Sequence, residues 1–254
     1  MRTFPASVHL PFAFPGLPGI GCIFGTRIGG ESARPFDRAN ISLEVGDRPG
    51  RVLSNRKSMQ LCLGFKHWQE LRQVHGTHMV FEPEPADIPD MPALEGDGLA
   101  TSRPGQALVI KTADCQPVLL AHCGGGFVAA LHVGWRGNVA RFPVTGVQRF
   151  CEHYGLKARD VLAVRGPSLG PGASEFVNFE QEFGDEYREY HDSKARTVDL
   201  WRLTRDQLLA AGIPERNIFG LDLCTHSLPE LFFSYRRDRI TGRQASVIWI
   251  KQPL

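Results

Sequence analysis

ALVIKTADCQPVLLAHCGGGFVAALHVGWRG, at residues 107–137, contains three apolar runs of the kind that form β-strands. They are ALVIK at 107–111, PVLLA at 117–121 and FVAALHV at 127–133. Three consecutive glycines separate the second run from the third, and a glycine break between two apolar runs is typical of a β-hairpin. We therefore predict three strands, the last two of which form an antiparallel hairpin around a loop at 123–126.

The register of this hairpin places a cysteine near a histidine. With the loop at 123–126, His132 lies opposite Pro117, and Cys115, two residues before Pro117, shares its face of the sheet. Cys115 and His132 are then diagonal neighbours, roughly 7–8 Å apart at most, and zinc bonds of about 2.0–2.3 Å can bridge such a gap. A one-residue slip in the loop would separate the two side chains, and each also suits buried packing.

A third ligand is needed to complete a metal site. His75, in QVHG at 73–76, is the best candidate, because it stands beside a glycine at the end of one of the extended segments that we predict around it within 70–81. The spacing along the sequence does not by itself bring His75 to Cys115. The three residues form a candidate His₂Cys site.

The rest of the chain predicts a mixture of helices and strands. Helical spacing over 51–63 ends at Gly64, a natural C-cap. Further helices are expected at 143–154, 178–190 and 198–211, a terminal strand at 245–250, and a surface loop in the proline-rich and acidic stretch 82–93. Such a pattern indicates an α/β or α+β layered sandwich with a mixed sheet, in one domain over residues 1–254.

Composition excludes several functional classes. The 254 residues are 42% hydrophobic and 22% charged with a net charge of +2, which argues against nucleic-acid and membrane-surface binding. A chain of this length needs no structural metal to fold, so a bound metal is expected to serve chemistry. Arginine supplies 23 of the 29 basic residues, which fits an anionic substrate or simply a preference for arginine codons.

Cysteine usage and the N-terminal stretch predict a cytoplasmic protein. The six cysteines form no CxxC pair, as expected for reduced thiols. The first 24 residues are apolar but carry four prolines and His9, so they do not resemble a signal peptide, and no stretch reaches transmembrane length. We expect no membrane, nucleic-acid or protein partner.

Motifs from about residue 20 to residue 250 resemble the YfiH or laccase-domain family, also called peptidoglycan-editing-factor-like. Several separated motifs carry the resemblance, and they occur in the family's order: GTRIGG at 25–30, PFDRANISLEVGD at 35–47, SNR at 54–56, QVHG at 73–76, DGLAT at 97–101, KTADCQPVLL at 111–120, HVGWRG at 132–137 and CT…FFSYRRD..TGR at 224–243.

The resemblance implies a zinc enzyme that acts on purine nucleosides. Zinc would be bound by His75, Cys115 and His132, in a fold similar to the catalytic domain of cytotoxic necrotising factor. The implied reactions are phosphorolysis of adenosine, inosine and methylthioadenosine and hydrolytic deamination of adenosine, with a nucleoside and phosphate as the small-molecule partners. A His₂Cys zinc also leaves a fourth position for water, whose pKa the metal lowers.

Other residues in the motifs are candidates for substrate binding. Asp114, beside Cys115, would move protons or orient a ligand, or serve the local structure. Candidates for phosphate or substrate binding are Arg27, Asn40, Arg56, Asp97, Arg136 and Arg237. Arg136 is the first choice for phosphate because it follows a ligand closely, although each arginine also suits a surface ion pair and Asn40 and Asp97 also suit turn capping.

One loop departs from the family pattern. The family reads GPCIGPCCYEV where this chain has GPSLGPGASEFV at 166–177, so cysteines are replaced at Ser168, Gly172 and Ala173. If this loop lines the pocket, the substrate preference would differ from that of the family. None of the three ligands is affected.

Three alternatives stay open at this point. A multicopper laccase fits poorly, because the chain has nine histidines and no HxH pair, although copper in place of zinc would give incidental phenol oxidation. A metal-free hydrolase of amides, with Cys115 as nucleophile and His132 as base, explains two of the three residues. A non-catalytic metal-binding module is the third.

Overall fold

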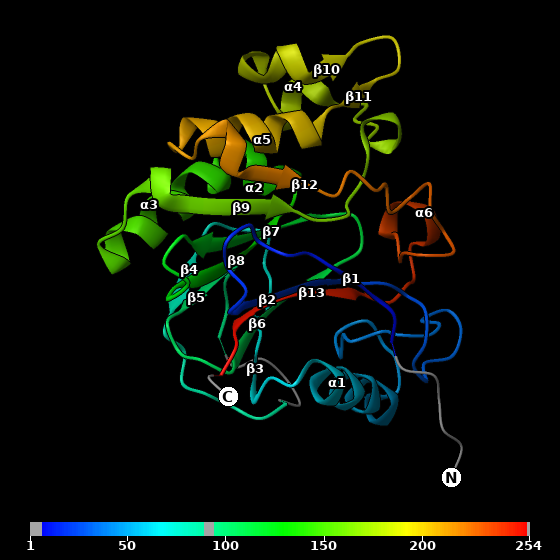
Figure 1. The fold of residues 1–254 in the computed structure, drawn as a ribbon. Helices are drawn as coiled ribbons and strands as arrows, with labels where there is room; N and C mark the ends of the chain where they lie inside the picture. The colour runs from blue at the N-terminus through cyan, green and yellow to red at the C-terminus, as the bar shows by residue number, and fades with distance from the viewer. Residues whose placement is uncertain (1–6, 89–93, 253–254) are drawn as a thin grey trace.

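Two β-sheets stacked face to face form the centre of the molecule (Figure 1). The computed structural model describes residues 7–88 and 94–252. The five-stranded sheet has the order β1-β2-β13-β6-β3, and the six-stranded sheet the order β12-β9-β7-β8-β5-β4. The strands of the five-stranded sheet are β1 (His9–Pro11), β2 (Ile20–Gly25), β13 (Gln244–Ile250), β6 (Gln106–Thr112) and β3 (His67–Gln69). Those of the six-stranded sheet are β12 (Ile218–Gly220), β9 (Val161–Arg165), β7 (Gln116–His122), β8 (Val128–Val133), β5 (Gly98–Thr101) and β4 (Met79–Phe81). Both sheets are mixed, since β3–β6, β4–β5 and β9–β12 pair in parallel.

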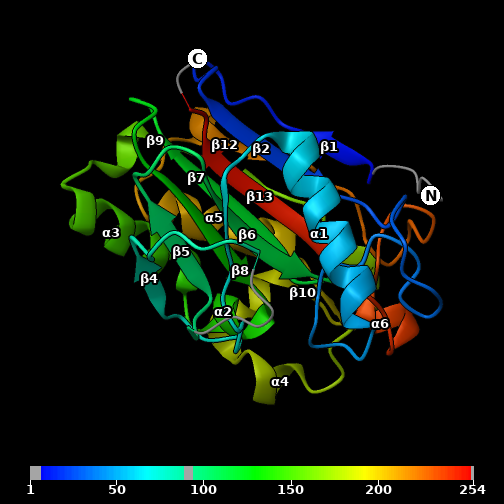
Figure 2. The ribbon, with the colours of Figure 1, turned by 90° about the horizontal axis from the view of Figure 1, so that it is seen from below.

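Helices cover the outer face of each sheet, so the fold has four layers (Figures 1 and 2). Helix α1 (Pro49–Leu63) packs Met59 against Trp68 and Val109 on the five-stranded sheet. Helices α3 (Phe142–Tyr154) and α5 (Leu200–Ala210) cover the six-stranded sheet. The remaining elements are short: α2 (Trp135–Val139), α4 (Phe179–Glu182), α6 (Tyr235–Asp238), β10 (His191–Asp192), β11 (Thr197–Val198) and 3-10 turns at Ala158–Asp160, Pro171–Ala173, Asp185–Tyr190 and Glu215–Asn217.

The central strands are buried on both faces. Between the sheets, Phe24, Leu108 and Ile110 meet Leu119 and Ala130 in one apolar cluster. All residues of β6, β8 and β13 are buried, which explains why these strands read as continuous apolar runs rather than alternating ones. None of the helices in the described part of the chain has both the length and the apolar character that a membrane span requires.

The layered mixed-sheet sandwich that the sequence predicted is confirmed, including the hairpin register. Pro117 pairs with His132, and the backbone N–H of His122 donates to the carbonyl of Phe127. The predicted helices near 51–63, 143–154 and 198–211 and the strand near 245–250 are present. The likeness to cytotoxic necrotising factor stays a prediction.

One predicted element is wrong in part. The segment 178–190 is not one helix, because α4 ends at Glu182 and Gly184 adopts a φ of 86° before a separate 3-10 turn. The segment 70–81 is extended on both sides of His75, as predicted: Arg72 forms a parallel bridge with Glu95, β4 closes the segment, and His75 lies in the bend between them. The predicted loop at 82–93 has no regular structure over 82–88, and 89–93 lies outside the described residues.

Candidate metal centre and its cavity

A cavity of about 550 Å³ opens where strands of both sheets end. Lys111 and Thr112 come from the end of β6, in the five-stranded sheet, whereas Gln116 begins β7 and His132 lies near the end of β8. Loops around 166–176 and 234–243 complete the wall. The stacking of the two sheets therefore brings polar residues from separate layers to one hollow.

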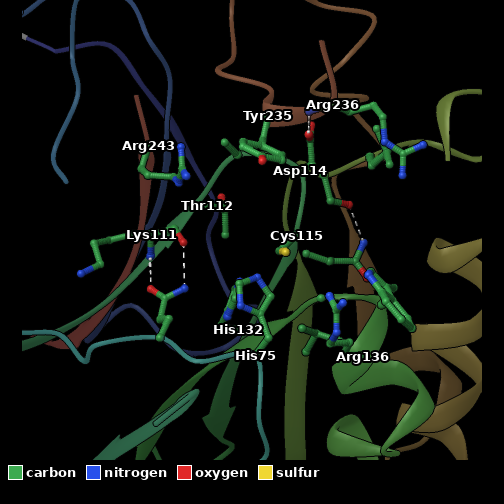
Figure 3. A pocket seen from close by; sticks show the side chains of 18 of the residues that line it. His75, Lys111, Thr112, Asp114, Cys115, His132, Arg136, Tyr235, Arg236 and Arg243 are labelled. Carbon is green, nitrogen blue, oxygen red and sulfur yellow. Dashed lines mark hydrogen bonds between the residues drawn. The ribbon is translucent and has the colours of Figure 1, made fainter. Parts of the chain in front are cut away.

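Three potential metal ligands lie together in this cavity (Figure 3). The ligand atoms of His75, Cys115 and His132 are all within 4.8 Å of one another. The two imidazole rings are 4.9 Å apart between centroids and inclined at 72°. His75 is exposed, Cys115 half-buried and His132 buried, so the group faces the cavity from its floor.

A single buried carboxylate holds both histidines. Asp97 Oδ1 accepts from the His132 ring at Nδ1 over 2.7 Å and from the backbone N–H of His75 over 3.0 Å. Its Oδ2 accepts from the backbone N–H of Gly76 at 2.7 Å. These bonds stabilise the left-handed backbone of His75, which has a φ of 60°. With Nδ1 bound to Asp97, His132 presents Nε2 for a metal or for Cys115.

Gly134 gives the cluster its room. A Cβ at this position would lie 3.0 Å from Sγ of Cys115 and 3.2 Å from Cδ2 of His75. Any larger residue would therefore push two of the three ligands apart, which explains the glycine in the HVGWRG motif.

The cluster favours charge separation between its sulfur and its buried ring. Burial opposes ionisation of Cys115, but the neighbouring His132 and His75 lower the pKa of its thiol to about 6. Burial likewise opposes protonation of His132, but the Cys115 thiolate and Asp97 raise the pKa of this imidazole. Both shifts favour the thiolate of Cys115 and the protonated ring of His132.

We expect Cys115 to be alkylated at neutral pH in protein treated with a chelator. Because its pKa is lowered, its reaction with iodoacetamide should persist at pH 7 and fall away only below about pH 6. Buried Cys22 and Cys151, whose pKa values are raised by burial, should stay unmodified at pH 7. Peptide mass spectrometry across a pH series measures this. An alkylation midpoint for Cys115 above pH 8 would contradict it.

The donor set fits a transition metal. Two imidazoles and one thiolate suit zinc, and the carboxylate behind His132 is the partner that metal-binding histidines usually have. The same three donors also suit copper, whose affinity for such ligands is higher. The residues that would hold the metal are His75, Cys115 and His132.

Basic side chains surround the rest of the cavity. Lys111 Nζ pairs with Glu44 at 2.9 Å and with Glu70 at 3.3 Å, so its charge is already balanced. Half-buried Arg243 donates from Nη1 to the carbonyls of Thr241 and Gly242. Burial lowers the pKa of Arg243, and the negative charge of Cys115 opposes that effect. Three more arginines line the cavity: Arg136, Arg236 and Arg239.

Asp114 lines the cavity but is bound to its neighbours. Its carboxylate accepts from the backbone N–H of Arg236 at 2.6 Å (Figure 3). It also accepts from Thr225 Oγ1 at 2.7 Å. Its φ of 100° turns the chain between β6 and β7. These contacts tie the 224–236 segment to the cavity and give Asp114 a structural role, whereas its role in moving protons or orienting a ligand stays a prediction.

Of the predicted substrate-binding residues, two lie at the site and four lie away from it. Arg136 lies in the cavity, stacked 4.2 Å from the Trp135 ring, and Asp97 lies behind the histidines rather than in the wall. Arg27 and Arg237 line a separate surface groove. Fully buried Asn40 accepts from the Ser42 and Arg243 backbone N–H groups and donates to Asp47, and Arg56 pairs with Glu70 at 2.9 Å. Arg27, Asn40, Arg56 and Arg237 are not among the residues that line the cavity, and their part in substrate binding stays a prediction.

Sequence reasoning missed several residues of the cavity wall. Arg236, Arg239 and Arg243 all belong to the YRRD..TGR part of the last motif, from which only Arg237 was selected. The motif was the available signal, but consecutive residues point in different directions. The divergent loop does line the cavity, through Ser168, Leu169 and Phe176.

Comparisons with known proteins agree on one family. The chain matches the family described as multi-copper polyphenol oxidoreductase laccase over residues 21–251. A Shigella flexneri protein named purine nucleoside phosphorylase YfiH is 36% identical over 249 residues, covering 91% of this chain and 94% of the relative. A purine nucleoside phosphorylase of Xylella fastidiosa is 36% identical over 270 residues, covering 98% of this chain and 99% of the relative.

Solved structures agree with this match. The Neisseria meningitidis protein NMB0706 superposes with a TM-score of 0.84 at 29% identity, over 96% of this chain and 99% of that chain. A hypothetical protein YfiH from Bacillus licheniformis superposes with a TM-score of 0.82 at 30% identity, over 91% of this chain and 93% of that one.

Proposed function

The chain belongs to the multi-copper polyphenol oxidoreductase laccase family, which includes YfiH, and from this premise we propose that it is a zinc-dependent purine nucleoside phosphorylase that also deaminates adenosine. The observation that carries the proposal is the His75–Cys115–His132 cluster on the floor of a cavity with basic and aromatic walls. Adenosine, inosine and methylthioadenosine are the proposed nucleosides.

The zinc would supply a Lewis acid and lower the pKa of a water molecule it binds. The protein's own residues hold that centre, because Asp97 fixes both histidines and Gly134 leaves space for the sulfur. The residues on the floor of the cavity would therefore hold the metal, and those in its walls would bind the two substrates.

The walls suit a nucleoside and a phosphate. Trp135, Phe176 and Tyr235 present aromatic rings to the cavity, which suit a flat purine base. Arg243 and Thr112 both line the cavity where β6 pairs with β13, and they offer a guanidinium and a hydroxyl to a phosphate. In phosphorolysis a phosphate oxygen attacks C1′ of the ribose, the bond from C1′ to N9 breaks, and its electron pair leaves with the base, which takes up a proton.

Replacing Arg243 by methionine should weaken phosphate binding selectively. We expect the KM for phosphate to rise roughly 10-fold or more because a charge-assisted contact is lost, with the KM for inosine changed much less. Arg27→Met, in the separate groove, is the matched control and should change neither. Release of hypoxanthine and ribose 1-phosphate measures both constants. Equal effects of the two substitutions would refute this phosphate site, and a wild type without phosphate-dependent release would refute phosphorolysis.

A second candidate function is favoured by one observation. Asp97 is hydrogen-bonded to His132, whose ring lies beside Cys115, and cysteine hydrolases combine a carboxylate, a base and a nucleophile in the same way. In that mechanism the thiolate attacks an amide carbonyl and His132 protonates the leaving amine, which gives His75 no role. Activity on an amide that survives His75→Ala but not Cys115→Ala would favour this alternative.

A further inference from the structure

Two buried polar side chains in the cavity wall leave one atom without a partner. Gln116 and Ser168 are only 4% and 2% exposed, and both line the cavity. Gln116 Nε2 lies 3.1 Å from Ser168 Oγ. The other amide atom, Oε1, is buried and has no hydrogen-bond partner among the described residues. Buried amide atoms are nearly always paired, so this one marks a place where a ligand completes the bonding.

Ser168 is fixed from several directions. Trp201 Nε1 donates to Ser168 Oγ at 2.7 Å, and an indole nitrogen can only donate. The backbone N–H of Ser168 donates to the carbonyl of Leu223 at 3.2 Å, and its own carbonyl accepts from Thr225 at 2.9 Å. The hydroxyl therefore stays in place while its hydrogen is free to rotate.

A fixed hydroxyl of this kind supports both orientations of the Gln116 amide. When Ser168 Oγ accepts from the amide NH₂, the amide oxygen is left as an acceptor for a ligand. When the hydroxyl donates to the amide oxygen instead, the NH₂ is left as a donor. Trp201 can keep its bond to Ser168 in both arrangements, because a hydroxyl has two lone pairs and one hydrogen.

The surroundings of Gln116 suit the base rather than the phosphate. Apolar Val133 pairs with Gln116 across the hairpin, apolar Leu169 follows its partner Ser168 in the wall, and the amide itself carries no charge. The cations Lys111 and Arg243 lie elsewhere: Lys111 is in β6, and Arg243 directly precedes β13 (Figure 3). A purine base is flat and largely apolar, with hydrogen-bonding groups on its edges.

We propose that Gln116, anchored by Ser168 and Trp201, turns its amide to bind either a 6-amino or a 6-oxo purine. The amide oxygen accepts from the amino group of adenosine, and the amide NH₂ donates to the oxo group of inosine. This inference rests on the proposed nucleoside function and explains how one cavity takes both substrates.

Gln116→Leu tests the inference with three nucleosides. We expect kcat/KM to fall roughly 10- to 100-fold on adenosine and on inosine, because the partner of a substrate hydrogen bond is lost. Purine riboside, which has no substituent at position 6, should lose less than about 3-fold. Phosphorolysis in phosphate buffer measures all three, and zinc content with the melting temperature confirms that the variant is folded.

Gln116→Glu supplies a second, nearly isosteric test. An ionised carboxylate only accepts, so the ratio of kcat/KM for adenosine to that for inosine should rise by roughly 10-fold at pH 8. Gln69→Leu, at a buried glutamine that donates to the carbonyl of Glu84 away from the cavity, should leave the ratio unchanged.

The outcomes separate this inference from the function on which it rests. A wild type inactive on all three nucleosides would overturn both. An active wild type with equal losses on the three nucleosides in Gln116→Leu, or an unchanged ratio in Gln116→Glu, would overturn the role of Gln116 alone.

Discussion

Cys115→Ala is expected to abolish metal binding and to reduce kcat/KM on every nucleoside by roughly 10³-fold or more, because a lost metal ligand removes several kcal/mol of transition-state stabilisation. The thiol is the only sulfur in the three-residue cluster, and His75 and His132 alone leave two donors. The substitution should leave the fold intact, because the half-buried Cys115 belongs to none of the buried apolar clusters described above.

Cys123→Ala is the matched control, since Cys123 is an exposed thiol in the loop of the same hairpin. It should keep full metal content and activity. Metal analysis, circular dichroism and steady-state kinetics on the two variants and the wild type compare them directly. A folded Cys115→Ala protein that retains metal and activity would contradict the proposed centre.

Asp97→Asn is expected to have the second largest effect, on both metal affinity and stability. Metal affinity should fall roughly 10- to 100-fold because His132 loses the carboxylate that orients its ring. Stability at pH 7 should fall by about 1–3 kcal/mol, since an amide cannot accept every N–H that the fully buried carboxylate accepts from His132, His75 and Gly76.

The stability loss should depend on pH. Burial opposes ionisation of Asp97, but its hydrogen bonds to His132, Gly76 and His75 prevail and lower its pKa. A carboxylate whose pKa is lower in the folded than in the unfolded protein contributes stability that is fully present above its unfolded pKa of about 4. This stability is lost as the pH falls through the folded pKa. The difference between wild type and Asp97→Asn should therefore shrink below about pH 4.

Urea unfolding at several pH values and competition with a chromogenic chelator measure the two effects. Asp185→Asn is the control, because Asp185 is 82% exposed in its pair with Arg188, and its loss should leave stability and metal affinity almost unchanged. Wild-type metal affinity in Asp97→Asn would show that the carboxylate is not needed to position the ligands.

The sequence predicted the parts of the site that depend on local pattern. Three glycines between apolar runs fixed the hairpin loop, and strand alternation then placed Cys115 and His132 on one face. His75 joins them through a contact that no spacing reveals, since its turn depends on hydrogen bonds to Asp97, a residue in another motif. Only the family resemblance connected the two segments.

The missed residues have physical reasons too. Arg237 was selected and Arg243 was not, although Arg237 donates to the backbone carbonyls of Thr225, His226 and Phe232 outside the cavity. Whether an arginine binds backbone or faces a cavity depends on the direction of its side chain, which composition does not contain. The side chain of Arg56 likewise points into the protein, where it is fully buried against Glu70.

The elements that sequence patterns missed are short or fully buried. Strands β2 and β9 are buried along their whole length, so they lack the alternation that marks a half-exposed strand. The predicted helix at 178–190 failed at Gly184, where a positive φ interrupts the chain.

The most direct test of the central claim is the metal content of purified wild type and His75→Ala, measured with inosine cleavage in the presence of phosphate. We predict close to one zinc per wild-type chain with phosphate-dependent hypoxanthine release, and the loss of both in His75→Ala. A metal-free wild type, or a His75→Ala protein that keeps full activity, would contradict the proposed metal centre and favour Cys115 and His132 as a hydrolase pair.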